Sequence, residues 1–99
     1  MGAELIITPE AFDDLAEAMD WYDEQRPGLG EDFLSSVHAS IASTMRMPTM
    51  HEKVRFEYRR ALVRRFPYAI YYECDDQRFT IYGVVHTARD SEAWRRRLP

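Results

Sequence analysis

The chain has 99 residues, of which 45% are hydrophobic and 30% are charged, and its formal net charge at pH 7 is −4. Two halves of such a chain would be too small to bury separate cores, so we expect one domain over residues 1–99. The composition is too hydrophobic for a disordered chain, and no stretch approaches the roughly 18 apolar residues that span a bilayer. The single cysteine and the absence of a secretory signal predict a cytoplasmic protein without a disulfide.

The charges are divided unevenly along the chain. Residues 1–50 carry ten acidic and two basic side chains, whereas residues 51–99 carry eleven basic and seven acidic ones. Ten of those eleven bases are arginine, which binds carboxylate and phosphate groups in a planar, bidentate geometry. Two interpretations follow: the halves attract each other within a solvated fold, or the basic half presents a face to an anionic target or an acidic partner.

The first half of the chain predicts one strand and two helices. The apolar run at residues 4–7 predicts a strand, and Thr8 with Pro9 predicts a helix start, since threonine caps free N–H groups and proline favours the first helical position. Residues 26–30 end this helix, and a second amphipathic helix ends before Pro48, which completes an antiparallel hairpin. The spacing in the first helix predicts a buried stripe and a solvent-facing set of acids: Phe12, Leu15, Met19 and Tyr22 form the stripe, and Asp13, Asp14, Glu17 and Asp20 form the acidic set.

The second half predicts three strands, over residues 58–66, 68–74 and 78–86, and a short helix from about Ser91. An α+β fold follows, in which the helical hairpin covers one face of an antiparallel sheet and leaves the other face open. Strand alternation places Tyr68, Ile70 and Tyr72 in the core, with Tyr71 and Tyr82 as the exposed tyrosines. In the last strand it predicts one face of Phe79, Ile81, Gly83 and Val85, and an opposite face of Thr80, Tyr82, Val84 and His86.

Motifs for metals and nucleotides are missing from the sequence. His38, His51 and His86 are widely separated, and Cys74 has no ligand spacing around it, so we predict no metal site. The four glycines form neither a phosphate-binding loop nor a dinucleotide fingerprint, and no serine-hydrolase elbow occurs. We therefore predict no cofactor.

One catalytic hypothesis remains, which is metal-free RNA cleavage. That reaction needs a base, an acid and cations around the phosphate, and His86 at a strand end is suited to proton transfer, with Glu57 or Glu73 as weaker bases. The alternative is a histidine that hydrogen-bonds locally and arginines that lie over the sheet. The hypothesis requires that the strands bring a set of side chains to one sheet edge: Arg59, Arg60, Arg64, Arg65, His86 and Arg89.

Several motifs occur in the order found in one protein family. Together they resemble the RelE/ParE superfamily of toxins from bacterial type II toxin–antitoxin modules, over nearly the whole chain. This resemblance implies the order β-α-α-β-β-β with a short C-terminal helix, and a cognate antitoxin whose tail covers the toxin. The motifs are Trp21-Tyr22, Gly28-Leu29-Gly30 followed by Phe33-Leu34, Pro48, the run from Arg60 to Tyr72, and the run from Val84 through Asp90 to Trp94 and Arg97.

The resemblance implies a fold but two different activities. In the RelE-like branch, which cuts messenger RNA on the ribosome, Lys53, Arg60 or Arg65, His86 and Arg89 would form the catalytic set. That branch often has a C-terminal tyrosine, which is missing here, and an acidic protein is poorly suited to ribosomal RNA.

The sequence is more similar to the ParE-like branch, which inhibits DNA gyrase by protein contact and needs no catalytic set. A third alternative is a degenerate member that binds its antitoxin without being toxic. For the ParE-like alternative the candidate target-binding residues are Arg64, Tyr71, Tyr82, Trp94, Arg95, Arg96 and Arg97.

Overall fold

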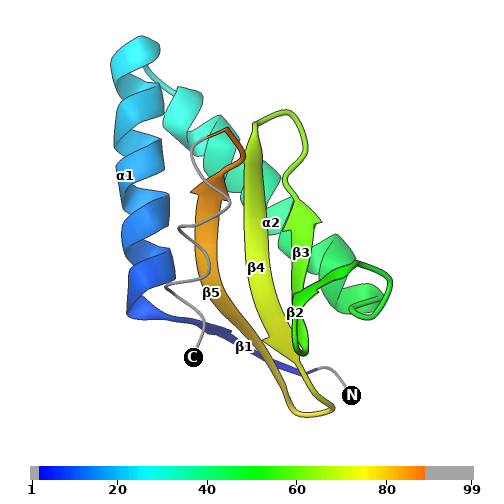
Figure 1. The fold of residues 1–99 in the computed structure, drawn as a ribbon. Coiled ribbons are helices and arrows are strands. Elements are labelled where there is room, and N and C mark those ends of the chain that lie inside the picture. Colours follow the sequence, from blue (N-terminus) through cyan, green and yellow to red (C-terminus); the bar gives the residue numbers. More distant parts are fainter. Residues whose placement is uncertain (1–2, 89–99) are drawn as a thin grey trace.

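Two helices pack against one face of a five-stranded sheet, with α1 running beside the sheet and α2 crossing behind it (Figure 1). The structure, a computed structural model, describes residues 3–88. The elements are β1 (Glu4–Ile7), α1 (Pro9–Gln25), α2 (Leu29–Arg46), β2 (Lys53–Arg55), β3 (Tyr58–Leu62), β4 (Tyr68–Cys74) and β5 (Arg78–His86). The α+β fold with a helical hairpin on the sheet is confirmed, whereas the predicted helix from Ser91 lies outside the described residues.

The strands are ordered β1-β5-β4-β3-β2, and this order corrects the prediction in two respects. First, β1 pairs in parallel with β5, so the sheet is mixed and not purely antiparallel. Second, β2 forms an additional antiparallel edge strand beside β3. A strand of three residues carries too little periodicity to be recognised, and the pairing of the first strand with the last depends on tertiary packing.

The start of α1 follows the predicted capping, but its buried face is rotated. The hydroxyl oxygen of Thr8 accepts a hydrogen bond from the N–H of Ala11 at 3.2 Å, and Pro9 is the first helical residue. Phe12, which we predicted in the buried stripe, is 57% exposed. The small Ala11 and Ala18 are buried instead, since they let the helix approach the sheet; the buried residues are Ala11, Leu15, Ala18 and Tyr22.

Asp14 also departs from the predicted solvent-facing position. Its carboxylate accepts a hydrogen bond from the backbone N–H of Val84 at 3.0 Å. Pairing with β1 covers β5 only from Arg78 to Ile81, so Val84 lies beyond it. The carboxylate therefore supplies the acceptor that a neighbouring strand would otherwise provide.

The two glycines of the Gly28-Leu29-Gly30 motif make the hairpin possible. Gly28 precedes α2 with a φ of 90°, a backbone conformation that side chains with a Cβ rarely adopt. A Cβ on Gly30 would lie 2.7 Å from the backbone oxygen of Met19, so the two helices touch at this point. The N–H of Gly30 also donates to the Asp23 carboxylate at 2.8 Å, which joins the start of α2 to α1.

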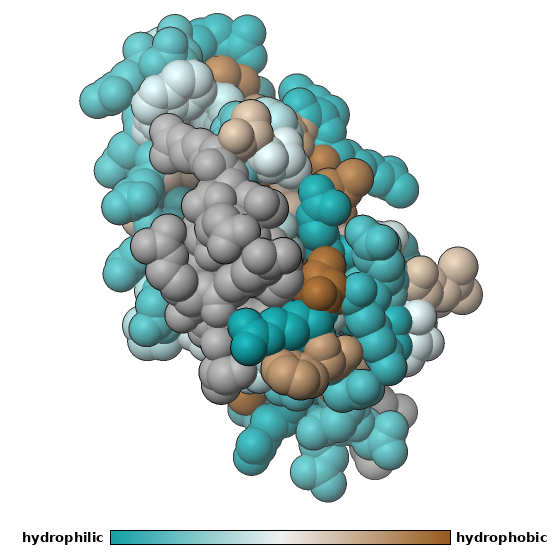
Figure 2. All heavy atoms as spheres, in the orientation of Figure 1, coloured by the Kyte–Doolittle hydropathy of each residue, from teal (hydrophilic) through white to brown (hydrophobic). Residues whose placement is uncertain are grey.

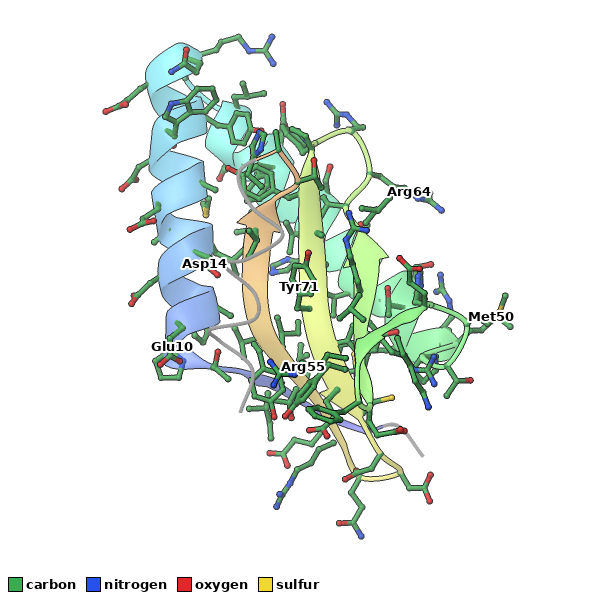
Figure 3. The ribbon with its side chains drawn as sticks, viewed as in Figure 1. Glu10, Asp14, Met50, Arg55, Arg64 and Tyr71 are labelled. Atoms are coloured by element: carbon green, nitrogen blue, oxygen red, sulfur yellow. The ribbon has the colours of Figure 1, made fainter. Side chains whose placement is uncertain are left out.

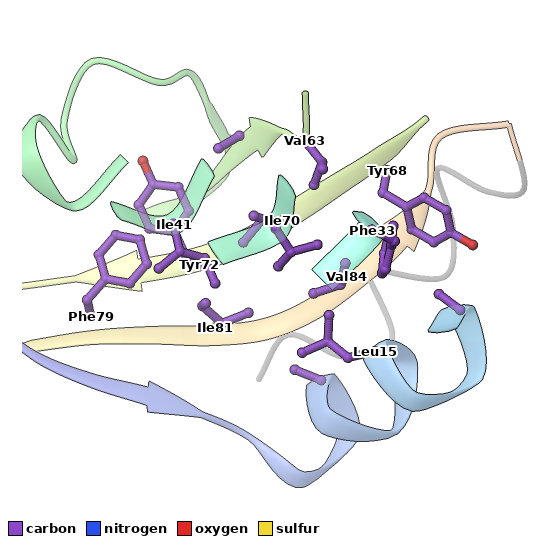
Figure 4. Close-up of a cluster of buried hydrophobic side chains, with 14 of the residues drawn as sticks. Leu15, Phe33, Ile41, Val63, Tyr68, Ile70, Tyr72, Phe79, Ile81 and Val84 are labelled. Carbon is purple, nitrogen blue, oxygen red and sulfur yellow. The ribbon is translucent and has the colours of Figure 1, made fainter. Parts of the chain in front are cut away.

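The main core lies between the helices and the sheet (Figure 4). Tyr68 and Tyr72 are buried there with Ile70, as predicted, and the Tyr72 hydroxyl donates to the backbone oxygen of Pro48 at 2.6 Å. The largest fully buried side chains are Tyr72, Phe33, Phe79, Ile70, Ile81 and Val37.

The opposite face of the sheet carries a second cluster, so the prediction that this face is open is wrong. We call it the tyrosine cluster: the buried Tyr58, Ala69 and Tyr71, against which Val54, Tyr82 and Val85 pack. Strand alternation places it away from the helices, because Tyr71 lies between two core residues of β4.

A β-bulge in β5 explains why the alternation predicted for that strand is wrong. Tyr71 pairs with Gly83 and Tyr72 pairs with Ile81, so Tyr82 is an additional residue on β5. The bulge reverses the alternation, and Val84 enters the main core while Val85 joins the tyrosine cluster.

Within residues 3–88, neither helix is long and apolar enough to cross a membrane.

Candidate functional site

Two members of the catalytic set proposed from the sequence, Arg60 and His86, lie apart in the part of the chain that the structure describes. Arg60 pairs across the sheet with Tyr71 of the tyrosine cluster. His86 pairs with Tyr68 of the main core, and their rings are 5.1 Å apart in an edge-to-face contact. These two side chains therefore project from opposite faces of the sheet.

His86 has the local hydrogen bond that the non-catalytic alternative predicted. Its Nδ1 accepts a hydrogen bond from the backbone N–H of Ala88 at 3.1 Å. The next residue, Thr87, donates its N–H to the backbone oxygen of Pro67 at 2.8 Å, which ties the end of β5 to the β3–β4 connection. The His86 ring thus holds the turn that follows β5.

Lys53 and Arg60 are engaged by carboxylates of their own hairpin. The ammonium of Lys53 lies 3.0 Å from a carboxylate oxygen of Glu57, and the guanidinium of Arg60 lies 3.7 Å from Glu52. The Arg60 Nε is buried without a hydrogen-bond partner among the described residues. Two of the four basic side chains of β2 and β3 are therefore paired with carboxylates close to them in sequence.

The remaining described arginines have different surroundings, and Arg59 and Arg60 do not converge with His86 at one edge. Arg59 donates to the backbone oxygens of Thr49 at 3.1 Å and His51 at 2.6 Å, and it holds the segment that follows α2. Arg64 is exposed in the β3–β4 connection and points away from the sheet (Figure 3). Arg65 is exposed there with a φ of 72°, its guanidinium 5.6 Å from the Phe66 ring centroid. Arg59 and Arg60 leave opposite faces of β3 because neighbouring strand residues alternate, whereas Arg64 and Arg65 lie in the connection after that strand.

The tyrosines predicted as exposed are part of a packed layer. Tyr71 is only 5% exposed, so it offers no ring to a partner, contrary to the prediction. Tyr82 is half-buried, its ring lies 5.4 Å from that of Tyr58, and its hydroxyl donates to Glu73 at 3.3 Å. Burial, together with the Glu73 charge, raises the pKa of Tyr82 to about 12, so the hydroxyl stays protonated.

A polar cleft of about 440 Å³ opens beside the tyrosine cluster. Its carboxylates are already engaged: Asp75 accepts N–H groups from Gln77 and Arg78, both at 2.8 Å, and these bonds lower the pKa of Asp75. Burial raises the pKa of the Cys74 thiol, so that group stays protonated and is a weak nucleophile. The lining residues are Glu57, Glu73, Cys74, Asp75, Arg78, Thr80 and Tyr82.

Sequence reasoning missed the turn between β2 and β3, where Phe56 is 70% exposed and has a φ of 51°. The guanidinium of Arg55 lies over this ring, 5.1 Å from its centroid. The turn contains neither glycine nor asparagine, which are the usual signals for a tight hairpin. On the face shown in Figure 2, hydrophobic residues form small patches among hydrophilic ones.

The predicted C-terminal site residues and the predicted lack of a metal site are taken here together. Arg89, Trp94, Arg95, Arg96 and Arg97 lie outside the described residues. Within residues 3–88, no group of three or more histidine, cysteine, aspartate or glutamate side chains is arranged to hold a metal ion. The described residues thus have separated cations and exposed large apolar side chains, among them Phe12, Trp21 and Phe56.

Two comparisons with known proteins found matches. A family model described as the ParE toxin of the type II toxin–antitoxin system parDE matches residues 5–91. A solved structure described as a chromosomal ParDE toxin–antitoxin system from P. aeruginosa has a TM-score of 0.74 and 14% sequence identity, and the match covers 85% of this chain and 95% of that one. At this identity the likeness shows the fold. No curated protein matches the chain.

Proposed function

We propose that this chain, which belongs to the ParE toxin family of type II toxin–antitoxin systems, inhibits growth by binding a target protein, DNA gyrase. It acts by surface complementarity, without a catalytic set, in the cytoplasm. A cognate antitoxin binds the toxin and blocks this surface.

The separation of His86 from Arg60 is the observation that carries the non-catalytic proposal. A general acid or base and its supporting cation must reach the same phosphate, within hydrogen-bond distance. Arg60 lies on β3 and His86 on β5, two strand spacings apart, and His86 lies three residues beyond Gly83, the β5 residue level with Arg60. Their backbones are therefore about 14 Å apart, and their side chains leave opposite faces of the sheet. One phosphate cannot contact both side chains.

Exposed apolar side chains on the first helix support a protein partner. Phe12 is 57% exposed and Trp21 is 50% exposed, on a helix whose charged residues are all acidic. Large exposed aromatic side chains are typical of protein interfaces. An antitoxin that covers them stabilises the folded toxin by linkage, so the toxin should melt at a higher temperature in the complex.

The test compares two assays of the purified protein. We expect inhibition of supercoiling by DNA gyrase, intact messenger RNA in a translating extract, and the same inhibition by a His86→Ala variant whose fold is verified by circular dichroism. Ribosome-dependent cleavage of messenger RNA that His86→Ala abolishes would favour the RelE-like alternative. An induced protein that neither slows growth nor inhibits gyrase would favour the non-toxic alternative.

A further inference from the structure

The turn between β2 and β3 holds an aromatic residue in an unfavourable backbone conformation. Phe56 and Glu57 join the paired Arg55 and Tyr58, and Phe56 has a φ of 51°. Glycine and asparagine adopt this left-handed conformation at least cost, whereas a bulky side chain is disfavoured there. Such local strain is concentrated at functional positions in proteins.

The side chain held in this way contributes little to the interior. Phe56 is 70% exposed, and it belongs to neither of the two hydrophobic clusters. Its one aromatic contact among the described residues is with the guanidinium of Arg55, 5.1 Å from the ring centroid. Burial in the fold therefore does not explain the presence of phenylalanine at this position.

Arg55 is the cation of this hairpin that remains available to a partner. Lys53 is paired with Glu57 and Arg60 with Glu52, and Arg59 is bound to two backbone oxygens. Within residues 3–88, no carboxylate pairs with Arg55. Aromatic residues, phenylalanine among them, and arginine are both enriched at protein interfaces relative to the rest of the surface.

The hairpin presents these two side chains on a rigid base. Tyr58, directly after the turn, is 8% exposed in the tyrosine cluster, and the N–H of Arg60 donates to the Glu52 backbone oxygen at 3.2 Å. A turn whose backbone is already held in place loses less conformational entropy when it binds a partner.

We propose that Phe56 inserts into an apolar pocket of the toxin's target protein and that Arg55 reaches a carboxylate at the rim of that pocket. We call these two side chains the anchor. This inference rests on the proposed function, because it names the part of the toxin that contacts the target. A protruding ring needs a concave, folded surface to receive it, which a target enzyme offers. An extended or helical antitoxin tail supplies side chains to grooves and has no such pocket.

Phe56→Asn is the decisive substitution, because asparagine removes the ring and tolerates the left-handed backbone. We expect the melting temperature to stay the same or rise, while the concentration needed to inhibit supercoiling by purified gyrase increases at least tenfold. Met50→Asn is the matched control, since Met50 is 69% exposed in a loop outside the proposed anchor, and it should inhibit like wild type.

Arg55→Gln tests the second contact with a smaller change. We expect a loss of inhibition of about three- to tenfold, and a weaker dependence of inhibition on salt than in wild type, because one charge contact is removed. A melting temperature equal to that of wild type excludes unfolding as the cause.

The outcomes distinguish this inference from the proposed function. A wild-type protein that does not inhibit gyrase overturns the proposed function and this inference with it. A wild-type protein that inhibits, together with a Phe56→Asn variant that inhibits equally, overturns the anchor alone. The anchor is also overturned if Phe56→Asn inhibits fully but escapes neutralisation by the co-expressed antitoxin, since the turn would then contact the antitoxin.

Discussion

The two faces of the sheet differ in how many side chains they bury and in the polarity of their margins. The face under the helices buries large aromatic and aliphatic side chains, among them Phe33, which is fully inaccessible and packs against the rings of Tyr22, Phe66 and Tyr68. The other face has three buried residues and a rim of tyrosine hydroxyls and charged groups. The first face has the composition of a core, and the second that of a smaller buried cluster with a polar margin.

Truncation of one ring on each face gives the largest expected difference. Phe33→Ala should lower the free energy of unfolding by about 3–5 kcal/mol, because it removes buried area and leaves a closed cavity. Tyr71→Ala in the tyrosine cluster should cost about 1.5–3 kcal/mol, because the smaller cluster allows water to fill the space. Urea unfolding of both variants measures the difference, and equal losses would show that both faces are closed to the same degree.

The helix-side face could be predicted in part from the sequence, with Phe12 and Val84 misplaced, whereas the packing of the other face could not be predicted. Helical spacing and strand alternation identified Tyr68, Ile70 and Tyr72 as core because each pattern stays in phase there. The bulge at Tyr82 reverses the phase of β5, and no local residue preference announces it. The three-residue strand β2, whose Val54 packs against the tyrosine cluster, is too short to show a period.

The candidate site was harder to predict for a related reason. Arg59, Arg60 and Arg78 lie on strands as predicted, whereas Arg64 and Arg65, predicted in a strand over residues 58–66, lie in the β3–β4 connection. The sequence carries no information on pairing, so the separation of Arg60 from His86 is visible only with the register. The exposed Phe56 turn lacked the residues that mark tight turns. Position along a strand can be predicted from one sequence, but which residues of different strands become neighbours depends on the whole fold.

The hydrogen bond between the Val84 N–H and the Asp14 carboxylate joins α1 to β5 at the edge of the helix-side face. Asp14→Ala should lower the free energy of unfolding by about 1–3 kcal/mol, because the N–H of Val84 loses its acceptor. Asp13→Ala, on the exposed side of α1, should change stability by less than about 0.5 kcal/mol. Amide hydrogen exchange at Val84 should accelerate in the first variant alone. Similar stability losses in both variants would show that helix charge, and not the hydrogen bond, causes the effect.

The smallest expected effect is on the pH dependence of stability, measured for one tyrosine on each face of the sheet. Burial is the main cause that raises the pKa of Tyr72 to about 12 on the helix side and that of Tyr82 to about 12 on the other side. A raised pKa means that each neutral hydroxyl stabilises the fold below pH 10, the ordinary tyrosine value, and that this stabilisation is lost as the pH rises toward 12. The stability of wild type relative to Tyr82→Phe should therefore be constant up to about pH 9 and fall above pH 10.

Urea unfolding at a series of pH values measures this difference, and Tyr72→Phe provides the comparison on the helix side. In that variant the hydrogen bond to the Pro48 backbone oxygen is also lost, so its stability should be lower than that of wild type already at neutral pH. The Tyr82 bond to Glu73 is longer, at 3.3 Å against 2.6 Å, and half-buried, so its loss in Tyr82→Phe should contribute less at neutral pH than the loss of the Tyr72 bond. If the relative stability of Tyr82→Phe does not change above pH 10, its hydroxyl ionises as readily in the folded as in the unfolded chain, and the tyrosine cluster is more open to water than its packing indicates.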